Sequence, residues 1–154
     1  MKHRLAMVAF LAALGLTFPA IQGCASWAHP AQWQDMDVEY DVGFPILWNA
    51  IKLTLIEKFH TIERERSAEG TLVTGWEEEL NYLAGQGFRE QAHIHAKKGE
   101  KGWRVYVRVV RQSNEEPIYT LESKHARWQA ADDNESRAQY LVGLIHSKLK
   151  ALVN

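Results

Sequence analysis

The chain has one cysteine, Cys24, among its 154 residues, and almost no excess of charge of either sign. A single cysteine excludes an intrachain disulfide. The 18 basic and 19 acidic side chains give a formal net charge of −1. Nucleic-acid binding requires a concentrated basic surface, so this balance argues against a nucleic-acid partner. The main apolar run, residues 5–18, is broken only by Gly15 and Thr17. It is shorter than the about 20 residues that a membrane-spanning helix needs.

Common motifs of catalytic sites are also missing from the sequence. There is no Gly-x-Ser-x-Gly elbow for a serine nucleophile and no His-Glu-x-x-His pair for a zinc enzyme. Gly85, Gly87, Gly99 and Gly102 do not have the spacing of a phosphate-binding loop, and no helix is predicted directly after them. We therefore predict a protein that is not an enzyme and holds no cofactor.

The N-terminal segment has the three parts of a signal peptide: a cationic head at residues 2–4, the apolar run, and a small residue, Gly23, before Cys24. With Ile21 three positions ahead of Cys24, this end resembles the lipobox of bacterial lipoproteins. In such proteins the cysteine thiol is acylated, for example with palmitate, and the amide bond before it is cut. The alternative is an ordinary secretory signal with an incidental cysteine, which would leave a reactive free thiol.

The resemblance implies a signal peptide over residues 1–23 and a lipid anchor on Cys24 that holds the protein to a membrane of the bacterial envelope. Ala25 is not an aspartate, so we expect the outer membrane, with the protein facing the periplasm. Residues 24–36 then form a lipidated tether, and residues 37–154 form a single domain. Trp27 and Trp33 in or near the tether are expected either at the membrane interface or packed against the domain.

Hydrophobic periodicity predicts the elements of the domain. Residues 36–42 alternate as in a half-buried strand, and residues 44–60 carry the apolar stripe of a core helix. Residues 61–66 and 71–76 are predicted strands, the first of them a charged edge strand. Residues 77–87 are predicted to be an acidic loop or a short broken helix.

The second half of the chain is predicted in the same way. Residues 88–97 and 103–111 alternate on either side of a Gly-containing turn and form a hairpin, and residues 118–122 form a weaker strand. Residues 124–132 form a connector, and the last helix begins at Asp132 or Asp133, with Asp132 and Glu135 as its capping pair. We predict an α+β fold with two layers, a mainly antiparallel sheet with two amphipathic helices on one face, in the order β-α-β-β-β-β-(β)-α.

The sheet face away from the helices is predicted to be basic and aromatic, and it is the candidate surface for binding a partner protein. Its members at this stage are Arg89, Arg104, Tyr106 and Arg108. The alternative is an ordinary solvated face whose side chains pair across strands.

His93 and His95 lie on the same face and are weak candidates for metal ligands, because residues two apart on a strand point to one side. A zinc site would need a third ligand from His125 or from one of the glutamates 77–79. The alternative is a pair of solvent-facing histidines, and we predict no metal.

Beyond the signal segment, the order of motifs resembles the small domains of BamC-type lipoproteins of the outer-membrane β-barrel assembly machinery. The motifs are Gly-Phe-Pro-Ile-Leu-Trp-Asn-Ala at 43–50, the charged stretch 61–66, Glu-Gly-Thr-Leu-Val-Thr-Gly-Trp at 69–76 and the hairpin. The resemblance covers residues 37–111. It implies an accessory module that binds an envelope protein or complex, with a role in envelope assembly. The alternative function is a small-ligand or metal-binding domain with hydrolytic activity, which would require several titratable side chains on the helix-covered side of the sheet.

Overall fold

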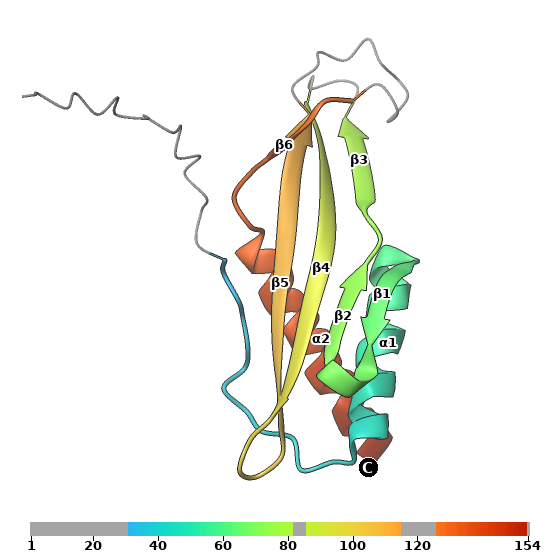
Figure 1. Ribbon diagram of the computed structural model, residues 1–154, viewed down its shortest axis with the longest axis vertical. Helices are drawn as coiled ribbons and strands as arrows, with labels where there is room; N and C mark the ends of the chain where they lie inside the picture. Colours follow the sequence, from blue (N-terminus) through green and yellow to red (C-terminus); the bar gives the residue numbers. More distant parts are fainter. Residues whose placement is uncertain (1–30, 82–85, 115–125, 154) are drawn as a thin grey trace, which may run out of the picture.

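The computed structural model describes residues 31–81, 86–114 and 126–153 (Figure 1). These residues form an open antiparallel sheet of six strands with two helices. The predicted α+β fold, a mainly antiparallel sheet covered by two helices, is confirmed. The signal segment, Cys24, the predicted strand at 118–122 and His125 lie outside the described residues.

The first helix, α1 (Phe44–Phe59), matches the predicted core helix. Pro45 lies in its first turn, where the N–H that proline lacks would have no partner within the helix. Leu47, Ile51 and Leu55 recur every four residues and are fully buried. The helix ends at Phe59, and the capping residue His60 has a left-handed backbone and donates its N–H to the carbonyl of Ile56.

Five strands follow α1 up to the end of the main hairpin, and a last short strand precedes the second helix. The strands are β1 (Ile62–Arg66), β2 (Thr71–Thr74), β3 (Glu77–Asn81), β4 (Gln86–Lys98), β5 (Trp103–Asn114) and β6 (Trp128–Ala130). Their order across the sheet is β1-β2-β4-β5-β6, and β3 pairs with β4 beyond the end of β2. A 3-10 turn, η1 (Ser67–Glu69), joins β1 to β2. Gly70 follows it at a φ of 66°, where a side chain would collide with the carbonyl oxygen of Ala96.

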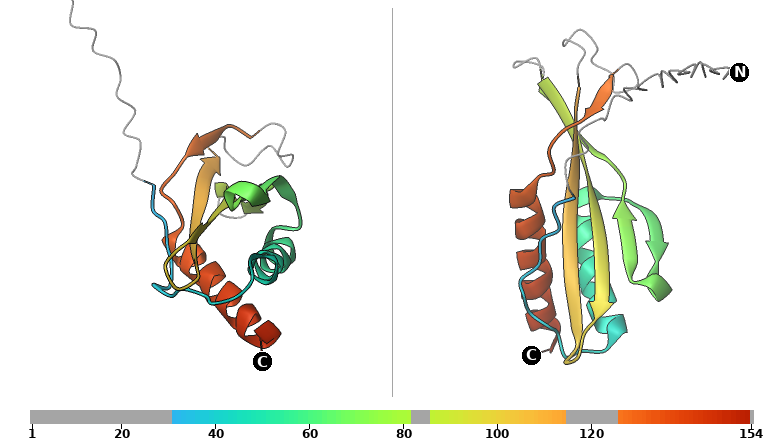
Figure 2. Two further views of the ribbon diagram at one scale, coloured as in Figure 1. Left: turned by 60° about the horizontal axis from the view of Figure 1, so that its bottom comes forward. Right: turned by 60° about the vertical axis from the view of Figure 1, so that its left-hand side comes forward.

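The helix-covered side of the sheet holds the core. In the register of β4 and β5, Ile94 lies opposite Val107 and Ala92 lies opposite Val109, and all four side chains are buried. The second helix, α2 (Glu135–Val153), adds buried residues such as Leu141. Both helices lie on this side of the sheet and pack against each other (Figure 2). The side turned away from them is called the open face below.

Two predicted segments have a different structure. The acidic stretch that begins at Glu77 is not a loop or helix but strand β3, because it pairs with the first half of β4. The predicted connector at 124–132 contains β6, which extends the edge of β5. In both cases a neighbouring strand supplies the backbone partners, a long-range effect that a local pattern of charged residues does not reveal.

The strand predicted for residues 36–42 is also wrong. This stretch belongs to a strap, residues 31–42, that runs along β5 and pairs with it only at Gln34–Val107 and Tyr40–Trp103. Gln34 and Tyr40 are six residues apart, whereas their partners Val107 and Trp103 are four residues apart. Asp37, at a φ of 52°, interrupts the extended chain between the two pairs.

The start of α2 differs from the predicted capping pair of Asp132 and Glu135. Asn134 is the capping residue, because its side-chain oxygen accepts the backbone N–H of Arg137 at 3.1 Å. Asp133 is thereby left to bind elsewhere, as described below.

Neither helix in the described part of the chain is both long and apolar enough to cross a membrane.

Candidate functional site

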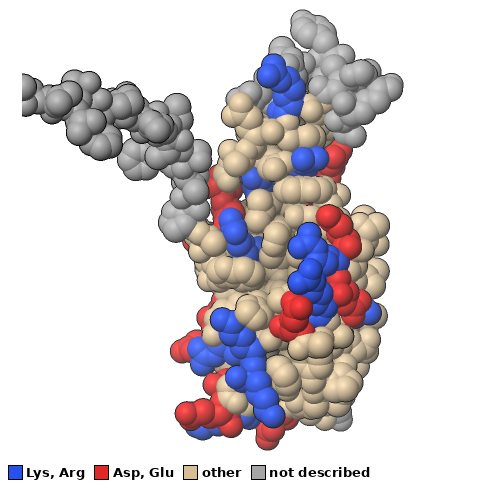
Figure 3. Space-filling model, viewed as in Figure 1, with Lys and Arg blue, Asp and Glu red and all other residues tan. Residues whose placement is uncertain are grey.

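The open face combines groups of positive charge with a mostly uncharged area between them. Figure 3 shows Lys and Arg gathered over β1 and β2 and again over the lower ends of β4 and β5. The register places His93 opposite Arg108, and His95 opposite Tyr106. Side chains directly opposite each other on paired strands share a face. The predicted candidate residues therefore lie on one surface.

Two of the three candidate arginines are bound by carboxylates of the same chain. Arg104 lies 2.9 Å from Asp37, and Asp35 and Glu39 of the strap lie within 4 Å of the same guanidinium. Arg108 donates two hydrogen bonds to Asp133, at 2.5 and 3.1 Å. The side chain of Asp133 is only 7% exposed. These arginines hold the strap and the start of α2 to the sheet.

The third candidate arginine, Arg89, is enclosed by aromatic rings. Its guanidinium carbon lies 4.5 Å from the ring centre of Trp76 and 4.8 Å from that of Trp128. Its Nε donates to Gln112 at 2.8 Å, and Glu78 lies 3.8 Å away. The charge of Arg89 therefore also has partners within the chain.

The uncharged centre of the open face is formed by Trp33, His95 and Tyr106, which we call the aromatic patch. Trp33 comes from the strap and makes an edge contact with His95, with ring centres 6.5 Å apart. It packs against the domain and remains 41% exposed. A half-exposed aromatic cluster of this kind is typical of surfaces that bind other proteins.

Free positive charge lies on either side of the aromatic patch. Among the described residues, Arg64 of β1 and Lys97 of β4 have no carboxylate within ion-pairing distance. Both are exposed, and the ammonium group of Lys97 lies 5.4 Å from the ring centre of Tyr106. Sequence analysis missed Arg64, because the alternation of charge in β1 indicates only an edge strand.

The histidine pair on this face is held in its neutral form. Burial lowers the pKa of His93, and the charges of Arg108 and Arg64 lower it further. Its Nε2 lies 3.0 Å from the side-chain oxygen of Gln91. Burial, together with Lys97, also lowers the pKa of His95. Neutral imidazole is the form that binds metals.

Among the described residues, no third metal ligand accompanies His93 and His95. Within those residues, no group of three or more His, Cys, Asp or Glu side chains is close enough to hold a metal ion. Glu77, one of the candidate glutamates, binds Arg137 on the other side of the sheet. Burial and neighbouring cations account for the lowered pKa of the two histidines.

A hollow of about 700 Å³ opens at the edge of the sheet, where β4 runs past the end of β2, and it reaches from the helix-covered side to the open face. Its apolar wall contains Phe44 and Trp103, whose ring centres are 4.6 Å apart. His95 and Lys97 line it as well, so the hollow is continuous with the aromatic patch. It offers space for a large apolar side chain next to a positive charge.

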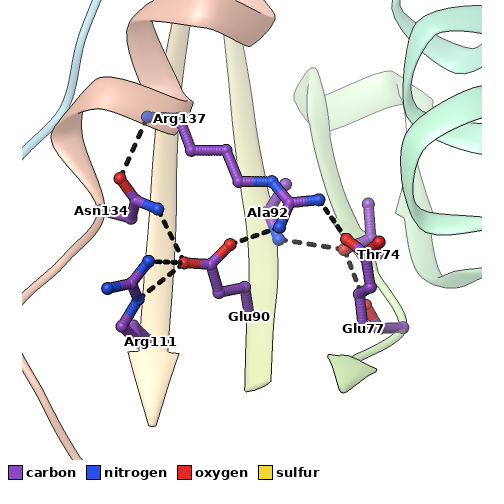
Figure 4. A network of polar contacts seen from close by, with 8 residues as sticks. Thr74, Glu77, Glu90, Ala92, Arg111, Asn134 and Arg137 are labelled. Atoms are coloured by element: carbon purple, nitrogen blue, oxygen red, sulfur yellow. Dashed lines mark hydrogen bonds and ion pairs between the residues drawn. The ribbon is translucent and has the colours of Figure 1, made fainter. Parts of the chain in front are cut away.

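A cluster of charged groups lies on the helix-covered side, where an active site was the alternative prediction. Glu90 is 1% exposed and is surrounded by Arg111, Arg137 and Asn134 (Figure 4). Arg111 and Asn134 each donate to its Oε1 at 2.7 Å, and Arg137 binds its other oxygen. Arg137 also binds Glu77, which joins α2 to β3. The only sequence signal for this cluster is the position of Glu90, which interrupts a series of apolar residues on the same face of the predicted strand.

The arrangement around Glu90 favours a structural role over a catalytic one. Burial by itself would raise the pKa of Glu90, but the hydrogen bonds from Asn134, Arg137 and Arg111 outweigh it and lower the pKa. Glu90 is therefore ionised at neutral pH. A general acid would need a raised pKa, and a general base would need an oxygen free to accept a proton. Both oxygens of Glu90 already bind cations, so the cluster fastens β3, β4, β5 and α2 together.

No protein-family model matches this chain, and no curated protein matches it at a significant level.

Proposed function

We propose that this protein is a lipid-anchored binding module of the bacterial cell envelope and has no enzymatic activity. The observation that carries the proposal is the position of Cys24, directly after Gly23 at the end of an apolar signal segment. The protein would be attached through Cys24 to the outer membrane and face the periplasm. Its resemblance to BamC-type lipoproteins supports an accessory role in envelope assembly.

The open face is the surface proposed to bind the partner, which is an envelope protein. The predicted arginines give this face its shape, since Arg89, Arg104 and Arg108 are held by groups of the same chain. Contact with the partner would instead come from the aromatic patch and from the free charges of Arg64 and Lys97. The hollow beside Trp103 would accept an apolar side chain of the partner, with a carboxylate directed to Lys97.

A photo-crosslinking amino acid in place of Tyr106 tests this assignment in living cells. We expect a discrete adduct with one envelope protein, because Tyr106 lies in the proposed interface. The matched control carries the same amino acid at Tyr140, which is 55% exposed on α2 and should give no protein adduct. Adding Arg64→Glu and Lys97→Glu should reduce the Tyr106 adduct without changing the circular dichroism spectrum. A protein adduct at Tyr140 and none at Tyr106 would place the interface on the helices and contradict the proposal.

A further inference from the structure

The helices expose an apolar surface on the side away from the sheet. Ile46, Leu53 and Ile56 of α1 are 44–45% exposed and fall on the side of the helix opposite its buried residues. Six of the nine exposed large hydrophobic side chains of the described chain lie on the two helices. Four of these six, Ile46, Leu53, Ile56 and Tyr140, fall on the side of their helix opposite its buried residues, and we call them the outer helical face.

Four lysines lie near this outer helical face, and three of them are in ion pairs, Lys52 with Glu65 of β1 at 2.9 Å. Lys52, Lys58, Lys148 and Lys150 lie on the two helices. Lys58 lies 6.0 Å from the ring centre of Tyr140. Lys58 and Lys148 share Glu57, at 3.1 and 3.0 Å. Among the described residues Lys150 has no ion pair. The helices thus combine apolar side chains with an excess of lysine, although the whole chain has a net charge of −1.

The described chain begins beside α2, where the backbone N–H of Gln32 donates to Asp133 at 3.1 Å. Seven residues, 24–30, precede the described chain, and they can span at most about 25 Å when fully extended. The strap that follows runs along α2, with contacts of 3.2 Å between Gln34 and Gln139 and between Tyr40 and His146 (Figure 2). An anchor on Cys24 would therefore keep the edge of the domain formed by the strap and the start of α2 near the bilayer, and this edge adjoins both the helical layer and, through Trp33, the open face.

We infer that the outer helical face lies on the surface of the bilayer that carries the anchor. This inference rests on the proposed anchor at Cys24. Leu53, Ile56 and Tyr140 would enter the boundary between headgroups and acyl chains, and the lysines would meet lipid phosphates, as in amphipathic helices that bind membranes in the plane of the interface. The tether supplies a high local concentration of membrane, so a weak contact is sufficient. The open face is then turned away from the membrane, toward the periplasmic partner.

The first test measures orientation with the unlipidated mature chain carrying Cys24→Ser, which removes the only cysteine. Leu53→Cys places a label sensitive to polarity on the outer helical face, and Val73→Cys places the same label on the open face, where Val73 pairs with His93. With vesicles of phosphatidylethanolamine and phosphatidylglycerol, we expect the emission of the Leu53 label to shift to the blue and that of the Val73 label to stay unchanged. Equal shifts at both positions, or no shift at either, would overturn the inference.

The second test measures affinity by sedimentation of the same chain with the same vesicles. Leu53→Glu with Ile56→Glu should weaken binding by about tenfold or more, because two carboxylates replace side chains that enter the interface. The matched control is Met36→Glu with Val38→Glu on the strap, at 42% and 38% exposure, and it should bind as the parent does. If the Leu53 variant instead converts a dimer into a monomer, a second copy covers this face and the inference is wrong. Neither test depends on acylation, so their failure is separate from failure of the anchor.

Discussion

Glu90→Ala should lower the free energy of unfolding by about 3–5 kcal/mol, because it removes one partner of a buried ion-pair network. The variant removes the carboxylate that both Arg111 of β5 and Arg137 of α2 bind. Asn134, which caps α2, also loses its acceptor. Urea unfolding followed by circular dichroism measures the change.

The matched control for this variant is Glu69→Ala. Glu69 forms an ion pair with Arg66 at 3.3 Å, and both side chains are more than half exposed. An exposed pair contributes about 0–1 kcal/mol, so the control should unfold almost as the wild type does. Equal, small losses in both variants would show that the cluster around Glu90 does not fasten the fold.

The same carboxylate should make the stability depend on pH. Since the pKa of Glu90 is lowered in the fold, the unfolded chain binds more protons on acidification than the folded chain does. The contribution of Glu90 is therefore complete above the ordinary carboxyl pKa of 4.5. It is lost as the pH falls through the lower, folded value. In Glu90→Gln the free energy of unfolding should fall less on acidification than it does in the wild type.

Val107→Asp should abolish folding. Val107 is fully buried in β5, where it lies opposite Ile94 and exchanges backbone hydrogen bonds with Gln34 of the strap. A carboxylate there would lose its hydration without gaining a partner. The cost would be comparable to or larger than the whole free energy of unfolding, which is about 5–15 kcal/mol for a small domain. Loss of the circular dichroism spectrum and of soluble protein would report this result.

The control for Val107→Asp is Gln112→Asp, on the same strand and on the open face. Gln112 accepts a hydrogen bond from Arg89, and an aspartate keeps an acceptor for that guanidinium, so the variant should fold. Arg108→Asp is not a suitable control, although Arg108 also lies on the open face. It would set a second carboxylate beside Asp133, whose side chain is only 7% exposed. Equal damage from Val107→Asp and Gln112→Asp would contradict the assignment of the two faces.

The helices and the hairpin could be predicted from sequence because their signals are local. The period of apolar residues places Leu47 and Ile51 on one side of α1, and strict alternation places Val105 and Val107 on one side of β5. Both patterns are set by which face meets the core, and a chain of this length has one core. The prediction of two helices on one face of the sheet follows from the same argument.

The partners of charged side chains could not be predicted, because they lie far apart in the sequence. Glu90 and Arg137 are 47 residues apart, and Arg104 and Asp37 are 67 residues apart. Alternation therefore identified Arg104 and Arg108 as members of the open face but did not show that carboxylates of the strap and of the α2 start neutralise them. Asp37 is a further example, since its left-handed backbone breaks a segment whose side chains alternate as in a strand.

Membrane attachment through Cys24 is the central claim, and fractionation of cells that express Cys24→Ser tests it most directly. Acyl burial contributes about 0.8 kcal/mol per methylene, and one chain alone binds only marginally, so stable attachment needs the several chains that a lipoprotein cysteine carries. The wild type should sediment with the membranes after a high-salt wash, and mass spectrometry should find its mature N-terminus acylated at Cys24. Cys24→Ser should move to the soluble fraction or accumulate as an unprocessed precursor. Correct processing and unchanged membrane retention of Cys24→Ser would contradict the account.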